Sequence, residues 1–92
     1  MYIFHTDPGH GWLAVKRSEL KRLGIIDKIS SYSYQKGQTV YLEEDCDATI
    51  FCQAKEAKGE KIEVKESYKK HTPIRHYPCF YCTDEERDLF CK

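Results

Sequence analysis

Histidine and cysteine side chains gather near the C-terminal end of the chain, where their types and spacing fit metal chemistry. The group consists of His71, His76, Cys79, Cys82 and Cys91. In Cys79-x-x-Cys82, the two intervening residues let a tight turn bring both sulfur atoms to one zinc ion at ~2.3 Å. We therefore expect one structural Zn²⁺, bound as a closed tetrahedral set by His76, Cys79, Cys82 and Cys91.

The fourth ligand of this predicted site has alternatives. A helix running unbroken from Asp84 to Cys91 would place Cys91 ~10 Å or more from the helix start, too far to share an ion with Cys82. Either this helix is only about one turn long, or His71 or Cys52 is the fourth ligand. The Cys-x-x-Cys motif is also compatible with a redox pair or with inert buried thiols. A complete set of four protein ligands leaves no position for water, so the predicted zinc site is structural.

A second group of titratable residues surrounds a turn near the N-terminus, in the run His5-Thr6-Asp7-Pro8-Gly9-His10. Two imidazoles and a carboxylate could bind a metal or act as acid and base. The alternative is an ordinary hairpin turn with exposed histidines, because Pro and Gly both favour turns. The chain contains no phosphate-binding loop and no Ser-His-Asp order, so we do not expect an enzyme.

Acidic residues and tyrosines form the third group. The run Glu43-Glu44-Asp45-Cys46-Asp47 precedes a predicted helix, whose free N–H groups and positive dipole end favour carboxylates. The same residues could form an acidic patch that docks on a basic protein surface. Exposed tyrosines often anchor interfaces, although cross-strand tyrosines also stabilise sheets. The residues that we predict to bind a partner are Glu43, Glu44, Asp45, Asp47, Tyr32 and Tyr34.

The first third of the chain predicts a hairpin and a helix. Tyr2–His5 and Gly11–Val15 are strand candidates, and Asp7-Pro8-Gly9 is the turn between them. Lys16–Leu23 has the leucine spacing of a short helix, and Gly24 is placed to end it.

The rest of the chain predicts three more strands and two helices. Ile29–Tyr34 and Thr39–Glu43 alternate as a second hairpin, and Lys61–Tyr68 alternates as a fifth strand. A helix capped by Asp45 or Asp47 should reach Lys58 and end at Gly59. Thr83-Asp84-Glu85-Glu86 matches a capping box, so a short helix should begin at Asp84.

These elements predict an α+β fold: a small antiparallel sheet of about five strands with two main helices and a zinc-bound C-terminal segment. With 92 residues, we expect one domain over 1–92, in which residues 1–70 form the α+β core and 71–92 form a His/Cys tail packed on it. So small a chain buries a limited core, and a metal would help to stabilise it.

Composition and charge restrict the function classes. Lys plus Arg and Asp plus Glu both number 15, whereas a protein that grips nucleic acid usually has a basic excess. No apolar run is long enough for a membrane span, and the N-terminus has no secretory pattern, so we expect a cytoplasmic protein. In a reducing compartment, five cysteines favour metal-bound or free thiols over disulfides.

Several segments together resemble a group of small uncharacterised proteins carried by bacteria, phages and plasmids. The resemblance covers about residues 5 to 76 and rests on the runs HTDPGHGWLAV, LGI, SYSY, YLEEDCD and TPIR. The Cys79, Cys82 and Cys91 cluster is not part of this pattern. In general character only, a small phage-like protein without catalytic motifs also resembles the anti-CRISPR inhibitors that bind Cas effectors.

The main hypothesis is therefore a zinc-stabilised binding protein, a monomer or small homo-oligomer, that inhibits a host defence nuclease such as a Cas effector by protein–protein contact. An alternative is a zinc-containing nucleic-acid-binding regulator that uses Lys65, Lys69, Lys70 and Arg75 as a local basic strip. A third hypothesis is a small metal-dependent enzyme that uses His5, Asp7 and His10.

Overall fold

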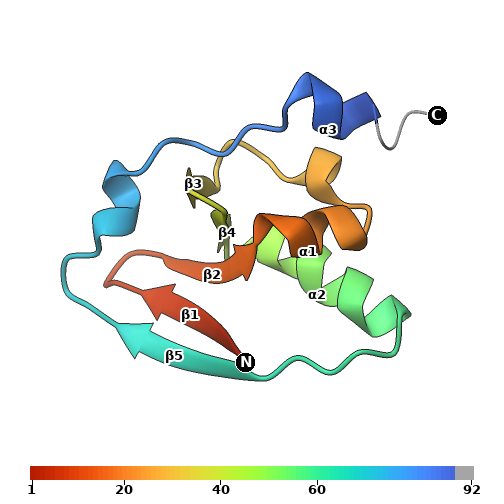
Figure 1. Ribbon diagram of the computed structural model, residues 1–92. Coiled ribbons are helices and arrows are strands. Elements are labelled where there is room, and N and C mark those ends of the chain that lie inside the picture. Colours follow the sequence, from red (N-terminus) through yellow and green to blue (C-terminus); the bar gives the residue numbers. More distant parts are fainter. Residues whose placement is uncertain (89–92) are drawn as a thin grey trace.

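A computed structural model describes residues 1–88 of the chain as an α+β fold around one five-stranded sheet (Figure 1). The strands are β1 (Tyr2–Thr6), β2 (Gly11–Lys16), β3 (Tyr34–Lys36), β4 (Thr39–Glu43) and β5 (Val64–Tyr68). The α-helices are α1 (Arg17–Arg22), α2 (Asp47–Ala57) and α3 (Asp84–Asp88), and the 3-10 helices are η1 (Ile26–Lys28) and η2 (Pro73–His76). Among residues 1–88, no helix is long and apolar enough to cross a membrane.

The strand order is β3-β4-β2-β1-β5, and the sheet is mixed rather than antiparallel as the sequence predicted. β5 pairs in parallel with β1, from Tyr2 opposite Val64 to Thr6 opposite Tyr68, whereas the other pairs are antiparallel. The cause is α2, because a helix between strands can carry the chain across the sheet to its far edge. The alternating pattern of a strand does not show whether the strand pairs in parallel or antiparallel, so the sequence did not predict the parallel pairing of β5.

The first hairpin and the first helix form where the sequence predicts them. The Asp7 carboxylate accepts hydrogen bonds from the backbone N–H groups of Gly9 and His10, both at 2.9 Å, and this arrangement fixes the turn. α1 ends at Arg22 with Leu23 as its C-cap, and the next residue, Gly24, has a φ of 71°, which suits a residue without a Cβ.

The segment before β3 corrects two predictions. Residues 29–33 are not a strand, and β3 is only three residues long. The Asp47 carboxylate accepts hydrogen bonds from the Ser30 and Ser33 hydroxyls and from the Ser30 N–H, which holds a compact turn there. Asp47 therefore does not cap α2, whose N-cap residue is Cys46. At 1% exposure Asp47 is also no part of a docking surface.

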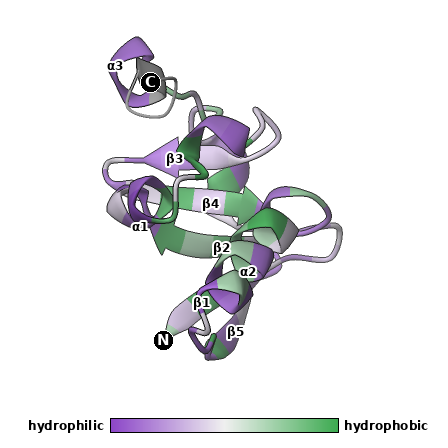
Figure 2. Cartoon of the chain, turned by 90° about the vertical axis from the view of Figure 1, so that its right-hand side faces the viewer, coloured by the Kyte–Doolittle hydropathy of each residue, from purple (hydrophilic) through white to green (hydrophobic). Residues whose placement is uncertain are grey.

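The core lies between one face of the sheet and the helices α1 and α2, which Figure 2 shows in front of the strands. Alternate residues of β2 and β4 point into it, in agreement with the period of two along a strand. Its fully or nearly fully buried side chains include Leu13, Val15, Leu20, Ile26, Val40, Leu42 and Phe51. At the edge of this core, the Tyr2 ring packs edge-on against Phe51, with 5.2 Å between ring centroids.

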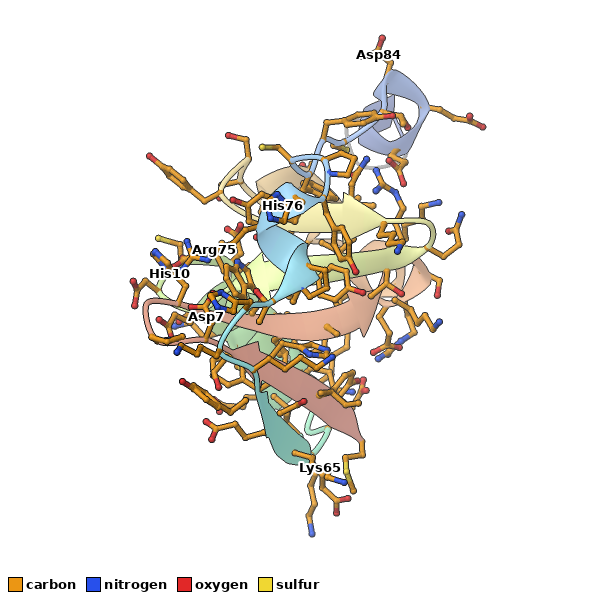
Figure 3. All side chains as sticks on the ribbon, turned by 90° about the vertical axis from the view of Figure 1, so that its left-hand side faces the viewer. Asp7, His10, Lys65, Arg75, His76 and Asp84 are labelled. Carbon is orange, nitrogen blue, oxygen red and sulfur yellow. The ribbon has the colours of Figure 1, made fainter. Side chains whose placement is uncertain are left out.

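The C-terminal segment passes over the other face of the sheet and then along its β3 edge (Figure 3). The Tyr77 ring lies 5.3 Å from that of Tyr41 on β4. Farther along, Gln35 N–H donates to the Pro78 carbonyl and Phe80 N–H donates to the Ser33 carbonyl. Phe80 itself is buried in the main core. These backbone hydrogen bonds close the β3 edge of the sheet, whereas no strand within residues 1–88 pairs with the outer edge of β5.

The last described element is fixed by a capping box and a buried ion pair. Glu86 N–H donates to the Thr83 hydroxyl, and Thr83 N–H donates to the Glu86 carboxylate, as the sequence predicted for a helix that begins at Asp84. The Arg17 guanidinium donates to both oxygens of Glu86 at 2.7 and 2.8 Å. Arg17 also lies 5.0 Å over the Phe80 ring. These contacts join α3 to the start of α1.

Candidate protein-binding pocket

A pocket of about 320 Å³ opens between the first hairpin turn, the 32–34 segment and the acidic run after β4. Its wall is made by eight residues: His10, Trp12, Tyr32, Tyr34, Glu43, Asp45, Cys46 and Arg75. Four of these, Tyr32, Tyr34, Glu43 and Asp45, are residues that the sequence predicted to bind a partner. They come from two segments that the fold brings to the same opening.

The floor of the pocket is aromatic. Trp12 lies on β2 opposite Glu43 of β4 and is only 2% exposed. Tyr34 packs edge-on against Trp12, with 6.1 Å between centroids, and the His10 ring lies 5.9 Å from it on another side. Tyr32, by contrast, is 73% exposed, and its side chain makes no hydrogen bond or ring contact with any of residues 1–88.

Carboxylates form the rim. Glu43 is held in place because its Oε2 accepts the backbone N–H groups of Asp45 and Cys46, at 3.0 and 3.1 Å. Its Oε1 and the Asp45 carboxylate accept no hydrogen bond from the described part of the chain, and neither residue forms an ion pair there. Glu44 lies beside the pocket against Gly11, where its carboxylate is 2.9 Å from the position that a Cβ would take.

Arg75 closes the pocket from the side of the C-terminal segment. Its Nε and Nη2 donate to the two oxygens of Asp7 at 2.7 and 3.0 Å, and its guanidinium lies 5.5 Å over the Trp12 ring. Figure 3 shows Asp7, His10 and Arg75 together on this side of the molecule. The Arg75 guanidinium holds the pKa of Asp7 well below its usual range, so this carboxylate stays charged and balances the arginine.

The pocket therefore has a net negative rim over an aromatic floor. Carboxylates with unused oxygens suit a hydrogen-bond donor, and aromatic faces attract cations. Such a wall fits a positively charged or hydrogen-bond-donating group better than an anion.

The three residues of the N-terminal group serve different contacts. The His5 ring packs against Tyr41, with 5.8 Å between centroids, and burial together with the nearby Lys69 lowers the pKa of His5. Asp7 is occupied by Arg75 and the turn, and His10 lies on Trp12. In residues 1–88, no three His, Cys, Asp or Glu side chains are grouped so as to hold a metal, and this includes His5, Asp7 and His10.

The same observation applies to the predicted zinc ligands within the described chain. His76 is the last residue of η2 and is exposed. Cys79 is also exposed, and its backbone forms an isolated antiparallel β-bridge with Tyr34 at the sheet edge. The Cys82 thiol is half-buried and donates to the Thr83 carbonyl at 3.6 Å. Cys91 lies outside the described residues. The described ligands alone do not form a zinc site, so zinc stays a prediction for the complete set.

Neither alternative fourth ligand joins the predicted set in the described structure. His71 is exposed just before η2. Cys52 lies half-buried on α2 against the core, where burial raises the pKa of its thiol and disfavours the thiolate that binds zinc.

Sequence reasoning missed half of the pocket wall. Trp12 and Arg75 appeared only as a strand residue and as a member of a basic strip. His10 was a candidate metal ligand or acid–base group, and Cys46 had no predicted role in binding. The register that places Trp12 opposite Glu43 follows from the β2–β4 pairing, which joins strands separated by more than twenty residues.

Comparison of the chain with protein-family models, curated proteins and solved structures found no match.

Proposed function

We propose that this chain is a small binding protein from a mobile element that inhibits a host defence nuclease, such as a Cas effector, by direct protein–protein contact inside the bacterial cell. The observation that carries the proposal is the pocket, where Tyr32 and Tyr34 meet Glu43 and Asp45. Tyrosine is enriched at surfaces that bind proteins through a few anchor side chains. Unpaired carboxylates beside it can complement a basic partner.

The acidic and aromatic pocket suits a partner that itself binds nucleic acid, such as a nuclease. Proteins that bind nucleic acid carry surfaces rich in Lys and Arg, because phosphate neutralisation supplies much of their affinity. An acidic and aromatic surface can occupy such a surface by charge complementarity. The proposed protein would then compete with nucleic acid for the same basic side chains, without catalysing a reaction.

A pull-down with a panel of purified defence nucleases, followed by a DNA-cleavage assay, tests this proposal. Tyr32→Ala combined with Glu43→Gln should weaken both binding and inhibition. Tyr68→Ala is the matched control, because Tyr68 is 61% exposed but lies on β5, which is not part of the pocket. Cleavage that the wild-type chain leaves unchanged across the panel would refute the proposal.

A structural zinc on His76, Cys79, Cys82 and Cys91 remains part of the proposal. Elemental analysis of the purified chain should find one zinc, and Cys79→Ala with Cys82→Ala should lose it. The cysteine thiols must deprotonate to bind the metal, so the zinc should also dissociate more readily as pH falls. A metal-free protein with undiminished thermal stability would refute the zinc prediction. The binding function would still be decided by the pull-down and cleavage assays.

The second candidate is a nucleic-acid-binding regulator. The observation that favours it is a set of exposed lysines on and after the open β5 edge: Lys65, Lys69 and Lys70. Arg75 adds little to this strip, because Asp7 already neutralises it. Gel shifts at low and high salt separate the two functions, since this one requires salt-sensitive binding.

A further inference from the structure

We infer that the pocket binds the guanidinium group of an arginine side chain from the partner protein. This inference rests on the proposed function and specifies the group that the pocket recognises. It starts from the acceptors left without donors: the Glu43 Oε1 and the Asp45 carboxylate at the rim. Carboxylates that line one opening without an ion-pair partner favour a positively charged ligand.

The fixed position of Glu43 favours a directional ligand. Two backbone N–H groups hold Oε2, so the side chain is already oriented before a ligand arrives. A pre-oriented acceptor lowers the entropy cost of binding. Guanidinium matches it well, because its five N–H donors lie in one plane and can reach two carboxylates together.

The aromatic part of the wall favours a flat cation. The Tyr32 ring is open to solvent, and Tyr34 is held by its contact with Trp12. Guanidinium stacks on aromatic rings and is more weakly hydrated than an ammonium group, so it loses less on entering such a site.

The pocket wall itself shows this type of recognition. Arg75 is bound by both oxygens of Asp7 while it lies over the Trp12 ring. The proposed ligand would use the same two kinds of contact on the other side of the opening, with Glu43 and Asp45 as acceptors and Tyr32 as the ring. Because Asp7 balances Arg75, the local charge there remains negative.

Other ligands fit less well. A metal ion fits less well because, within residues 1–88, no three His, Cys, Asp or Glu side chains are grouped to bind one. The aromatic rings of the wall do not supply the oxygen ligands that a hard cation requires. A phosphate or a nucleic-acid strand would face Glu43, Glu44 and Asp45 at the rim, where like charges repel.

Titration with a short peptide that has one arginine between glycines, followed by NMR of the full chain, tests the inference. The expected result is saturable shifts at Trp12, Tyr32 and the 43–46 backbone. A lysine peptide should bind several-fold more weakly, and a citrulline peptide, which is nearly isosteric but uncharged, should bind about tenfold more weakly or not at all. Equal binding of arginine and citrulline peptides, or shifts only outside the pocket, would overturn the inference.

Variants separate this inference from the proposed function. Glu43→Gln with Asp45→Asn should weaken arginine-peptide binding about tenfold, and the glutamine can still accept the two backbone N–H groups that shape the turn. Glu63→Gln with Glu66→Gln is the matched control, because both residues are exposed near or on β5. Arginine binding without nuclease inhibition would leave the pocket inference standing and refute the function. Nuclease inhibition that survives Glu43→Gln with Asp45→Asn would refute the arginine-binding inference and leave the proposed function standing.

Discussion

The two faces of the sheet are covered in different ways. On one face, α1 and α2 bury a continuous apolar layer that includes Leu13, Leu42 and Phe51. On the other face and along the β3 edge, the C-terminal segment is held by a few specific contacts, of which Arg75 with Asp7 and Arg17 with Glu86 are the main ion pairs. Burial on the first face is spread over many side chains, whereas attachment of the segment depends on single residues.

This difference matters for function, because the pocket lies on the side held by single contacts. Trp12 belongs to β2, but Arg75 of the C-terminal segment covers its ring. The pocket therefore keeps its shape only while the segment stays attached. Variants can test whether the helix-covered face and the C-terminal segment unfold independently of each other.

The largest effect should come from the helical face. Phe51→Ala removes a fully buried ring from α2 and should lower the free energy of unfolding by about 4 kcal/mol, since neighbouring side chains only partly fill the cavity. Thermal or urea unfolding measures the change. Gln53→Ala, on the exposed side of the same helix, is the control and should change stability little. A small effect of Phe51→Ala would mean that the apolar layer is not the main source of stability.

The next effect should come from the buried end of the C-terminal segment. Glu86→Gln leaves Arg17 buried without its charged partner and should cost about 3 kcal/mol. The exposed neighbour Glu85 provides the control substitution Glu85→Gln. Hydrogen exchange should show faster exchange at Phe80 N–H, which bonds to the Ser33 carbonyl, before the strands β1 and β2 are affected. Uniform loss of protection in both regions would show that the two faces unfold as one unit.

The same ion pair predicts a dependence on acid. Arg17 is the main cause that lowers the pKa of Glu86 well below its ordinary value of 4.5, so the folded state favours the charged carboxylate. Its contribution is complete above about pH 4.5 and is lost as pH falls toward the lowered pKa, because protonation then favours the unfolded state. The difference in stability between wild type and Glu86→Gln should therefore begin to shrink below about pH 4.5 and keep shrinking as pH falls toward the lowered pKa of Glu86. A difference that persists unchanged at low pH would contradict this assignment.

A smaller effect is expected at the hairpin beside the pocket. In Gly11→Ala, the new Cβ would lie 2.5 Å from the Phe4 ring and 2.9 Å from the Glu44 carboxylate. We expect a cost of about 2 kcal/mol from the crowding. Phe4→Leu in the same chain should recover part of it, because the leucine lacks the ring atom in contact. Unfolding measurements on both single variants and the double variant give the coupling, and strict additivity would exclude the crowding.

The smallest effect on global stability should come from Asp7→Asn. The carboxamide can still accept the turn hydrogen bonds but no longer balances Arg75, which is partly exposed. Trp12 fluorescence should shift to longer wavelength as water reaches the ring, while the unfolding midpoint changes little. Asp27→Asn, at an exposed position on η1, should leave the fluorescence unchanged.

Local signals were sufficient for much of the fold. The first hairpin follows from Asp7-Pro8-Gly9, and the capping box at Thr83 and Glu86 follows from the hydrogen-bonding capacity of those two side chains. The prediction failed where a distant partner decides the outcome. Residues 29–33 alternate like a strand, but Asp47 binds Ser30 and Ser33 and holds them in a turn.

The candidate site shows the same division. Its tyrosines and carboxylates were predicted individually, because Tyr32, Tyr34, Glu43 and Asp45 are residue types that bind partners. Their meeting with Trp12 and Arg75 was not predicted, since it depends on the β2–β4 register and on the path of the C-terminal segment. No short-range pattern encodes the pairing of residues more than thirty positions apart.

The sequence by itself therefore determined the local elements, the turns and the residue types available for binding, because these depend on hydrogen bonds and side-chain spacing within a few residues. Only the tertiary structure decided that β5 runs parallel to β1, that Asp47 is a core residue and that the pocket has an arginine on its wall. These outcomes depend on burial and on contacts between distant segments, and the chain acquires both only when it folds.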